Sequence, residues 1–319
     1  MTDQSGDFRI GISSCLLGEK VRYDGSHKRD SFVTGTLAKL VTFVPVCPEV
    51  GVGMGVPRVT LRLSREEEEV RLVAPATGTD HTEEMREYSI KKALWLKSQD
   101  LSGFIFKKDS PTCGMERVRV YDKNGMPWKV GRGLFCEEVM KAFPQLPVEE
   151  EGRLRDPHLR ENFFVRVFAY RRLNKLFSGP WRMKDLISFH TREKFLLLSH
   201  DTNLYRELGR LVANAHAMDR DQAREAYCEK FMQTLSHIAV KKRHRNVLEH
   251  ILGHFKKLLN AAEKSEILEL IGEFSRGLIP LVVPLTLLRH HSRMNGMTYL
   301  ERQTYLDPHP RELMLRNHV

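Results

Sequence analysis

Three cysteines, each placed shortly after a run of apolar residues, constrain the fold of this chain more than any other feature of its sequence. They are Cys15 after residues 10–14, Cys47 after residues 41–46 and Cys113 after residues 103–106. Short apolar runs of this kind are typical of buried strands. In a parallel α/β sheet, the loops after the carboxyl ends of the strands converge on one edge, where ligands bind. We therefore predict an α/β parallel-sheet N-terminal domain in which the three thiols meet at one site.

The compartment predicted from the sequence argues against disulfide bonds among these thiols. Residues 1–8 are polar and lack the apolar core of a signal peptide. The longest apolar run, residues 278–288, contains two prolines and is too short to span a bilayer. We therefore predict a cytoplasmic protein that does not enter a membrane. Five cysteines in the cytoplasm favour metal binding or catalysis over disulfide cross-links.

The number and spacing of the cysteines limit which metal they could bind. Structural zinc normally takes four ligands, often from closely spaced pairs, but this chain has no Cys-x-x-Cys pair. Three thiolates can instead hold a [4Fe–4S] cluster and leave one iron open. The residues alone leave two interpretations, such a cluster or three unrelated buried thiols. Cys136 and Cys228 are not expected to be ligands, and Cys136, on the apolar side of a predicted helix, is interpreted as a structural thiol.

The net charge of +10 is confined to the second half of the chain. Residues 1–150 hold 22 Lys and Arg against 22 Asp and Glu, whereas residues 151–319 hold 29 against 19. A segment with prolines and an acidic run, residues 144–157, separates the halves, so we predict domains at residues 1–148 and 149–319. A neutral half joined to a basic half suggests that the second recruits a polyanion such as nucleic acid. The alternative is a basic surface that serves only solubility.

Helical periodicity extends through most of the sequence after residue 157, which predicts a nearly all-α C-terminal domain. The members of its densest basic cluster are Lys241, Lys242, Arg243 and Arg245. We predict that these four side chains contact RNA phosphates, the alternative being a solvated helix face. His250 and His254 stand four residues apart, but no third ligand nearby completes a metal site.

Five short motifs occur in order within the first 145 residues. They are residues 12–18 (ISSCLLG), 21–25 (VRYDG), 45–50 (PVCPEV), 57–58 (PR) and 110–114 (SPTCG). Together they resemble the thiouracil desulfidase (TudS, DUF523) family. The resemblance implies a [4Fe–4S] cluster on Cys15, Cys47 and Cys113, whose open iron takes the sulfur of a thiolated pyrimidine. It also maps the family's acidic and serine site residues to Glu49 and Ser110. The family's usual Gly-Gly-Leu is replaced here by residues 51–55 (GVGMG), in a loop expected to border the substrate.

The residue types at these positions suit sulfur removal. A soft iron site prefers sulfur to oxygen, so it can distinguish a thiocarbonyl from an ordinary pyrimidine. Replacing sulfur by oxygen requires proton movement, for which Glu49 is a candidate general acid/base and Ser110 a candidate hydrogen-bond donor or relay. The structural alternatives are a surface Glu49 paired with Arg58 and a turn-capping Ser110. No net electron transfer is required, and the chain carries no nicotinamide or flavin motif.

A second set of segments lies in the helical half: residues 195–200 (FLLLSH), 253–255 (GHF) and 303–310 (QTYLDPHP). They resemble the YbgA-type (DUF1722) domain over roughly residues 188–306. Fusions of the two families resemble the RudS desulfidases, which implies that the substrate is 4-thiouridine in tRNA. Two other functions stay open: desulfidation of a small free thiopyrimidine, and a non-enzymatic Fe–S sensor or electron carrier that binds nucleic acid. No protein partner is predicted.

Overall fold

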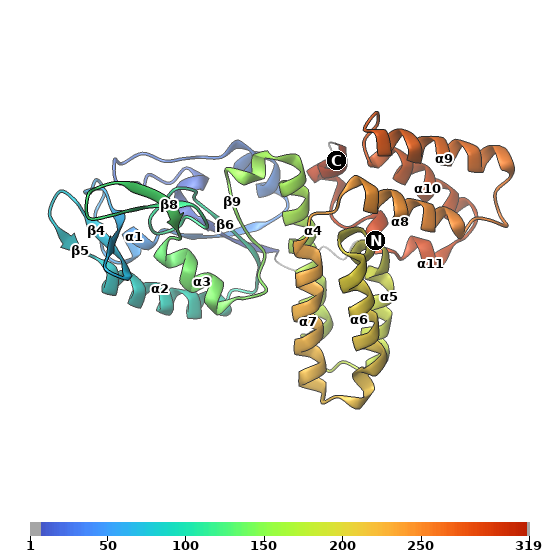
Figure 1. Ribbon diagram of the computed structural model, residues 1–319, viewed down its shortest axis with the longest axis horizontal. Helices are drawn as coiled ribbons and strands as arrows, with labels where there is room; N and C mark the ends of the chain where they lie inside the picture. Colours follow the sequence, from blue (N-terminus) through green and yellow to red (C-terminus); the bar gives the residue numbers. More distant parts are fainter. Residues whose placement is uncertain (1–7, 318–319) are drawn as a thin grey trace. The chain divides into compact units, whose positions relative to one another are not determined.

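A four-stranded parallel sheet lies at the centre of the first half of the chain (Figure 1). In the computed structural model, which describes residues 8–317, the strand order is β2-β1-β6-β9. The strands are β1 (Arg9–Ser13), β2 (Thr42–Val46), β6 (Leu101–Phe106) and β9 (Val148–Glu150). Every residue of β6 is buried, as expected for a strand with neighbours on both sides and helices over the sheet. The predicted α/β class of the N-terminal half is confirmed.

The helices of this half follow the expected sequence signals. They are α1 (Pro48–Gly51), α2 (Thr82–Lys97) and α3 (Leu134–Ala142). Helix α2 has Glu83 and Glu84 in its first turn and Lys97 in its last, which favours the helix macrodipole. It buries Met85 and Leu96 completely. Helix α2 packs against α3, and both helices lie to one side of the strands (Figure 1).

A second sheet was not predicted from the sequence. Its strand order is β5-β4-β3-β7-β8. The strands are β3 (Arg62–Glu66), β4 (Glu69–Ala74), β5 (Thr79–Asp80), β7 (Val118–Tyr121) and β8 (Pro127–Gly131). Leu63, Leu72 and Val118 from this sheet form a small core with Met85 of α2 and Leu134 of α3. Helix α3 also packs against the first sheet, because the ring of Phe135 lies 6.0 Å from that of Phe104 on β6.

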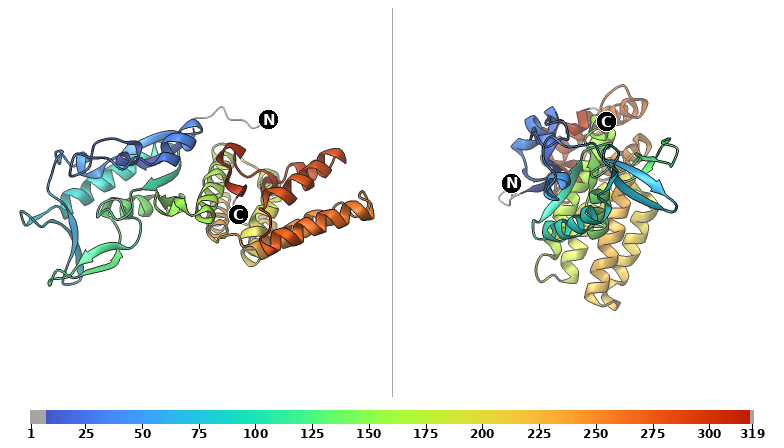
Figure 2. Two further views of the ribbon diagram at one scale, coloured as in Figure 1. Left: turned by 90° about the horizontal axis from the view of Figure 1, so that it is seen from above. Right: turned by 90° about the vertical axis from the view of Figure 1, so that its left-hand side faces the viewer.

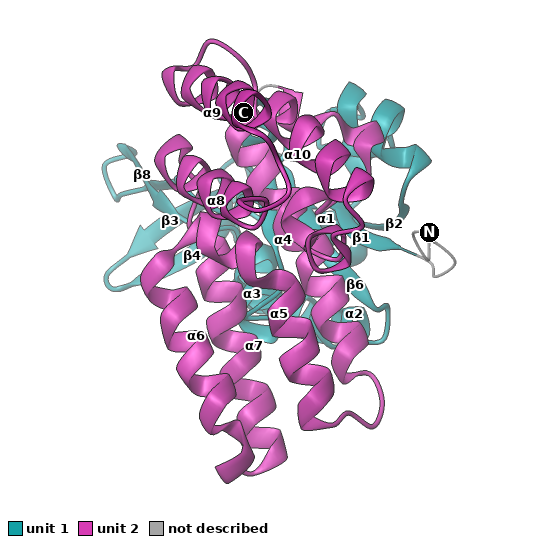
Figure 3. Ribbon diagram, turned by 90° about the vertical axis from the view of Figure 1, so that its right-hand side faces the viewer, with its two compact units in different colours: residues 1–155 teal, residues 156–319 magenta. Residues whose placement is uncertain are grey.

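The acidic run at residues 149–151 is a buried part of the first unit and not a linker. The chain divides into two compact units, residues 1–155 and 156–319 (Figure 3), whereas we placed the boundary after residue 148. Strand β9 pairs with β6, with Ile105 opposite Glu149. The three glutamates can be buried because each has a hydrogen-bond partner. Glu149 accepts from Arg153, Glu150 from the N–H of Met115, and Glu151 from Lys107.

Helices make up the regular structure of the second unit throughout its described residues, which confirms the predicted all-α half. They are α4 (Pro157–Phe177), α5 (Met183–His200), α6 (Thr202–Asn214), α7 (Arg220–Ser236), α8 (Lys241–Gly253), α9 (Ala261–Arg276), α10 (Val282–Met294) and α11 (Thr298–Glu301). Several begin at an N-cap side chain that accepts backbone N–H bonds, which stabilises the first turn. These caps are Asp156, Asp201, Asp219 and Asn260.

The helices of the second unit pack in two groups. Helices α5, α6 and α7 lie side by side, and α8 packs against both α5 and α9, with α10 on α9 (Figures 2 and 3). Large buried rings, including Phe189, Tyr227 and Phe231, fill the first group. Among the residues that the structure describes, no helix is both long enough and apolar enough to cross a membrane.

Candidate active site at the sheet edge

The three predicted thiols lie at the carboxyl edge of the sheet β2-β1-β6-β9. Cys15 lies in a short 3₁₀ turn directly after β1, Cys47 lies between β2 and α1, and Cys113 lies in the loop after β6. Strands β2, β1 and β6 are neighbours in the sheet. The fold therefore brings together three loops that are far apart in the sequence.

Burial is the main influence on these thiols. It raises the pKa of Cys15 to about 11, and it also raises the pKa values of Cys47 and Cys113. A smaller upward contribution comes from the thiols themselves, because charge on Cys47 acts on both of the others. Such thiols are protonated near neutral pH, and metal binding would displace their protons.

The thiols fit an iron–sulfur cluster better than a single metal ion. Among residues 8–317, no three His, Cys, Asp or Glu side chains are grouped closely enough to hold one ion. In a cluster each thiolate binds a different iron, so the sulfur atoms lie further apart than they do around zinc. Two buried thiols, Cys15 and Cys113, and the half-buried thiol of Cys47 at one sheet edge supply the three thiolates that such a cluster would need. Cys136 lies on α3, where its backbone N–H donates to the carbonyl of Thr112 but its sulfur lies beside that of Met140. Cys228 lies on α7 of the other unit.

Glu49 is paired with Arg58, but the pair is largely buried. The Arg58 guanidinium donates to Glu49 Oε2, with Nε at 2.9 Å, and also donates to the carbonyl of Val21 at 2.9 Å. The other carboxylate oxygen, Oε1, accepts from the hydroxyl of Thr112 at 2.8 Å. The side chains of Arg58 and Glu49 are 8% and 16% exposed. The pairing proposed as a structural alternative is therefore present, and it fixes the carboxylate at the sheet edge beside Cys47.

Ser110 and Thr112 connect Glu49 to the Cys113 loop. Ser110 Oγ accepts from the backbone N–H groups of Thr112 and Cys113, at 3.3 and 3.1 Å, so it does cap the turn. It also lies 3.0 Å from Thr112 Oγ1. A hydroxyl has one proton to donate, and Thr112 gives its proton to Glu49. Ser110 therefore donates to Thr112, which forms a hydrogen-bonded chain from Ser110 through Thr112 to Glu49.

Sequence reasoning missed three further groups beside the thiols. The first is Thr112, although it lies within the SPTCG motif next to a candidate ligand. The second is the ion pair of Lys107 Nζ with Glu151 Oε1, at 2.6 Å, which is almost buried. The positive charge of Lys107 opposes the burial that raises the pKa of Cys15. The sequence gives little indication of this ion pair, because its two members are 44 residues apart.

The third missed group is the phenol of Tyr88 on α2. A Cβ placed on Gly51 would lie 2.2 Å from the ring carbon Cζ of Tyr88, so the ring sits directly against the last residue of α1. Burial raises the pKa of Tyr88, and charges on Cys47 and Cys113 raise it further. The first residue of the glycine-rich segment 51–55, which we expected to border the substrate, is thus packed against an aromatic hydroxyl.

Replacing Gly133 by Ala is expected to disturb the Cys113 loop without touching a candidate ligand. A Cβ on Gly133 would lie 2.4 Å from the carbonyl carbon of Thr112 and 2.7 Å from the Cys113 nitrogen. Backbone cannot move aside as a flexible side chain does, and such overpacking costs about 1–3 kcal/mol. We expect a lower melting temperature and less bound iron per chain. Gly35→Ala, where a Cβ meets nothing within 4 Å, is the matched control and should change neither.

The predicted RNA-contacting cluster occupies the first turns of α8. Lys241 and Lys242 are exposed and have no acidic partner among the described residues. Arg243 lies 3.6 Å from Asp201, and Arg245 bonds to Glu249 at 2.7 Å. Two of the four predicted cations are thus already paired with carboxylates.

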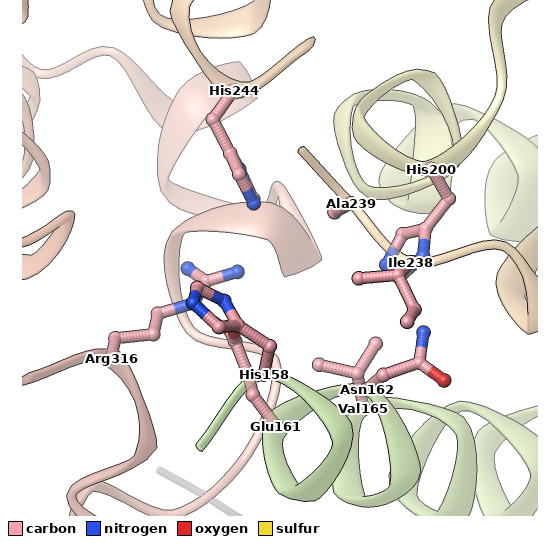
Figure 4. A pocket seen from close by; sticks show the side chains of 9 residues that line it. All are labelled: His158, Glu161, Asn162, Val165, His200, Ile238, Ala239, His244 and Arg316. Atoms are coloured by element: carbon pink, nitrogen blue, oxygen red, sulfur yellow. The ribbon is translucent and has the colours of Figure 1, made fainter. Parts of the chain in front are cut away.

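A buried polar cavity in the second unit is too small to be a substrate site (Figure 4). Its volume is about 10 Å³, which is the space for roughly one water molecule. Arg316 bonds to Glu161 at 3.0 Å, and His244 Nδ1 lies 2.9 Å from the hydroxyl of Tyr305. His244 Nε2 is buried without a protein partner and is directed toward this space (Figure 4). We interpret this cluster as a polar part of the helical core.

Comparisons with known proteins agree with both halves of the sequence interpretation. Residues 10–151 match the family described as 2-thiouracil desulfurase, and residues 194–310 match DUF1722, a family of unknown function. The uncharacterized protein YbgA of Escherichia coli (strain K12) is 30% identical over 158 residues, 49% of this chain and 94% of YbgA. The uncharacterized protein YbbK of Bacillus subtilis (strain 168) is 34% identical over 113 residues, 33% of this chain and 72% of YbbK. A solved structure described as a [4Fe-4S]-dependent thiouracil desulfidase, TudS, is 28% identical, with a TM-score of 0.37, and covers 47% of this chain and 94% of its own.

Proposed function

Because this chain belongs to the 2-thiouracil desulfurase family and also carries a DUF1722 region, we propose that it is an iron–sulfur-dependent desulfidase that converts 4-thiouridine in tRNA to uridine. The observation that carries the proposal is the convergence of Cys15, Cys47 and Cys113 at one sheet edge, beside the hydrogen-bonded carboxylate of Glu49. The RNA part of the proposal rests on charge, since the whole excess of +10 lies in residues 151–319.

The three thiolates would hold a [4Fe–4S] cluster. Three protein ligands leave one iron without a protein donor, and that iron would supply a Lewis acid that prefers sulfur to oxygen. The positive charge of Lys107 lowers the pKa of Cys15. The hydrogen bond from the Ser13 side chain lowers the pKa of Cys113. These contacts favour the deprotonated ligands in a site that burial would otherwise keep neutral.

The proposed reaction exchanges sulfur for the oxygen of water and transfers no net electrons. Water forms the new C–O bond at the thiocarbonyl carbon, the C–S bond breaks, and the sulfur leaves as hydrogen sulfide with both water protons. Glu49 is positioned to take a proton from the water and return it to the departing sulfur. Arg58 and Thr112 hold its two carboxylate oxygens in place, and Ser110 completes the chain behind them.

An RNA substrate has to present its thiolated base to a recessed site. Cys113 and Cys15 are only 5% and 8% exposed, so a base that stays stacked within folded RNA cannot reach them. Enzymes that modify bases solve this problem by acting on unstacked or flipped nucleotides. A basic helical unit that binds the RNA backbone would hold the substrate while one base enters the sheet edge.

Turnover of thiolated tRNA by the full chain is the direct test. Anaerobically prepared protein with its iron content measured would be incubated with 4-thiouridine-containing tRNA and, separately, with free 2-thiouracil. We expect sulfide release and loss of thiouridine from the tRNA, at a higher kcat/KM than for the free base. The same tRNA without thiouridine is the control. Turnover of the free base alone would favour a free thiopyrimidine as substrate, and no turnover of either by iron-loaded protein would favour a non-enzymatic sensor.

A further inference from the structure

A polar groove lies between three helices of the second unit. Its volume is about 450 Å³, within the usual range for small-ligand sites and far larger than the buried cavity of Figure 4. The residues that line it are Lys194 and Leu198 from α5, Thr202, Tyr205 and Arg206 from α6, and Asn246 and His250 from α8. No acidic side chain is among these residues.

Two cations of this groove lack counter-charges. Lys194 and Arg206 have no acidic partner among the residues that the structure describes. The carboxylates on the same helices are engaged elsewhere. Their partners are Arg182 for Asp185, Arg172 for Glu193, Arg243 and His237 for Asp201, Lys230 for Glu207 and Arg245 for Glu249. The positive charges of Lys194 and Arg206 are therefore available to an anionic ligand.

An aromatic ring in the groove is held in a fixed orientation. Tyr205 stacks on His190 with ring centroids 5.7 Å apart and an interplanar angle of 6°. Burial lowers the pKa of His190 to about 4, so this partner is neutral at physiological pH. His190 Nδ1 lies 3.2 Å from the hydroxyl of Tyr227, which fixes the ring further. A rigid aromatic ring beside unpaired cations is the combination that binds a nucleic-acid base together with its phosphate.

We propose that this groove binds an unpaired RNA segment of one or two nucleotides. Lys194 and Arg206 contact phosphate, Tyr205 stacks on a base, and Asn246, whose exposed amide both donates and accepts, contacts a base edge. An acidic peptide would use the cations but not the aromatic ring or the amide, so RNA fits the lining better. The proposal rests on the proposed function, because the RNA in question is the thiolated substrate.

This assignment moves the RNA site away from the cluster predicted from the sequence. Lys241 and Lys242 stand in the first turn of α8, whereas Asn246 and His250 line the groove further along the same helix. The two surfaces can therefore be separated by mutation within one helical unit and with equal changes of charge.

Two charge-reversed variants of the full chain test the proposal. Lys194→Glu with Arg206→Glu changes the groove, and Lys241→Glu with Lys242→Glu is the control with the same change of net charge. The readout is fluorescence anisotropy with unthiolated tRNA and with a single-stranded RNA oligonucleotide, over a range of salt concentrations. We expect the groove variant to bind about tenfold more weakly or worse, and its log–log salt slope for the oligonucleotide to fall by about 1.4, the value for two phosphate contacts. The control should keep most of its affinity.

A second variant separates stacking from charge. Tyr205→Ala is expected to weaken oligonucleotide binding about fivefold or more, because the loss of one base–aromatic stacking contact weakens binding by at least about that factor. Tyr205→Phe keeps the ring and should bind like the natural chain. Melting temperatures and turnover of free 2-thiouracil would verify that each variant is folded and that its first unit is intact.

The outcomes distinguish this inference from the proposed function. If the natural chain processes thiolated tRNA, and the groove variant binds RNA as tightly as the natural chain, the groove assignment is wrong and the proposed function stands. If the control variant loses RNA binding and the groove variant does not, the predicted cluster is the RNA site. If an acidic peptide occupies the groove and RNA does not compete with it, the occupant is a protein. If RNA binding depends on the groove but thiolated tRNA is never processed, the inference stands and the proposed substrate is wrong.

Discussion

Replacing Cys15, Cys47 or Cys113 by Ala is expected to give a chain that folds but holds no iron–sulfur cluster and releases no sulfide. Three thiolates are already fewer than the four that usually ligate such clusters, so the loss of one leaves two irons without a protein ligand. The affected side chains lie in loops at one sheet edge, and the sheet itself does not depend on them. Iron and acid-labile sulfide per chain, measured after anaerobic reconstitution, give the result directly, and circular dichroism verifies folding.

The two remaining cysteines provide matched controls. Cys136 is fully buried on α3, with its sulfur 3.8 Å from that of Met140, and Cys228 lies on α7 in the other unit. Cys136→Ala and Cys228→Ala should keep the cluster and turnover, at a modest cost in stability from the lost packing. A Cys113→Ala variant that retained full iron content would refute the ligand assignment.

The parallel sheet could be predicted because its signals are local. Each of β1, β2 and β6 is a short apolar run, and the convergence of their carboxyl ends follows from the general geometry of parallel sheets. The three thiols could therefore be assigned to one edge from the amino-acid sequence. The all-α half was predictable for the same reason, since helical periodicity is visible within a single segment.

The acidic run in β9 was misinterpreted because its partners are distant in sequence. Three successive glutamates usually indicate a solvated segment, and a nearby proline strengthened that interpretation. Glu151 is instead satisfied by Lys107 and by the backbone N–H of Lys108, and Glu150 by that of Met115. The second sheet was missed for a related reason, because β3 pairs in parallel with β7, which follows only after α2 and β6 in the chain.

Local charge density also gave an incomplete picture of the basic unit. Lys241 to Arg245 is the densest basic run in that half, but Asp201 and Glu249 neutralise part of it. The groove takes one cation from α5 and one from α6, and its other polar groups partly from α8, so no short stretch of sequence contains it. Which cations are unpaired is decided by helix packing, which sequence periodicity does not specify.

Glu49→Gln is expected to keep the cluster and lower kcat by about 10²- to 10⁴-fold, the usual contribution of a general acid or base. The amide preserves the shape of the side chain and can still accept from Thr112, but it can neither take up a proton from water nor balance the charge of Arg58. Ser110→Ala should also keep the cluster and lose most of the turnover, because it removes the donor at the far end of the chain to Glu49.

Thr112 allows the hydrogen-bonded chain to be tested apart from the carboxylate itself. Thr112→Val keeps the volume of this fully buried side chain and removes the proton that it donates to Glu49 Oε1 at 2.8 Å, whereas Thr112→Ser keeps the hydroxyl. We expect slow turnover in the Val variant and near-normal turnover in the Ser variant, at equal iron content. Near-normal rates in iron-loaded Glu49→Gln and Thr112→Val would mean that the carboxylate only anchors Arg58 and the loop at Val21.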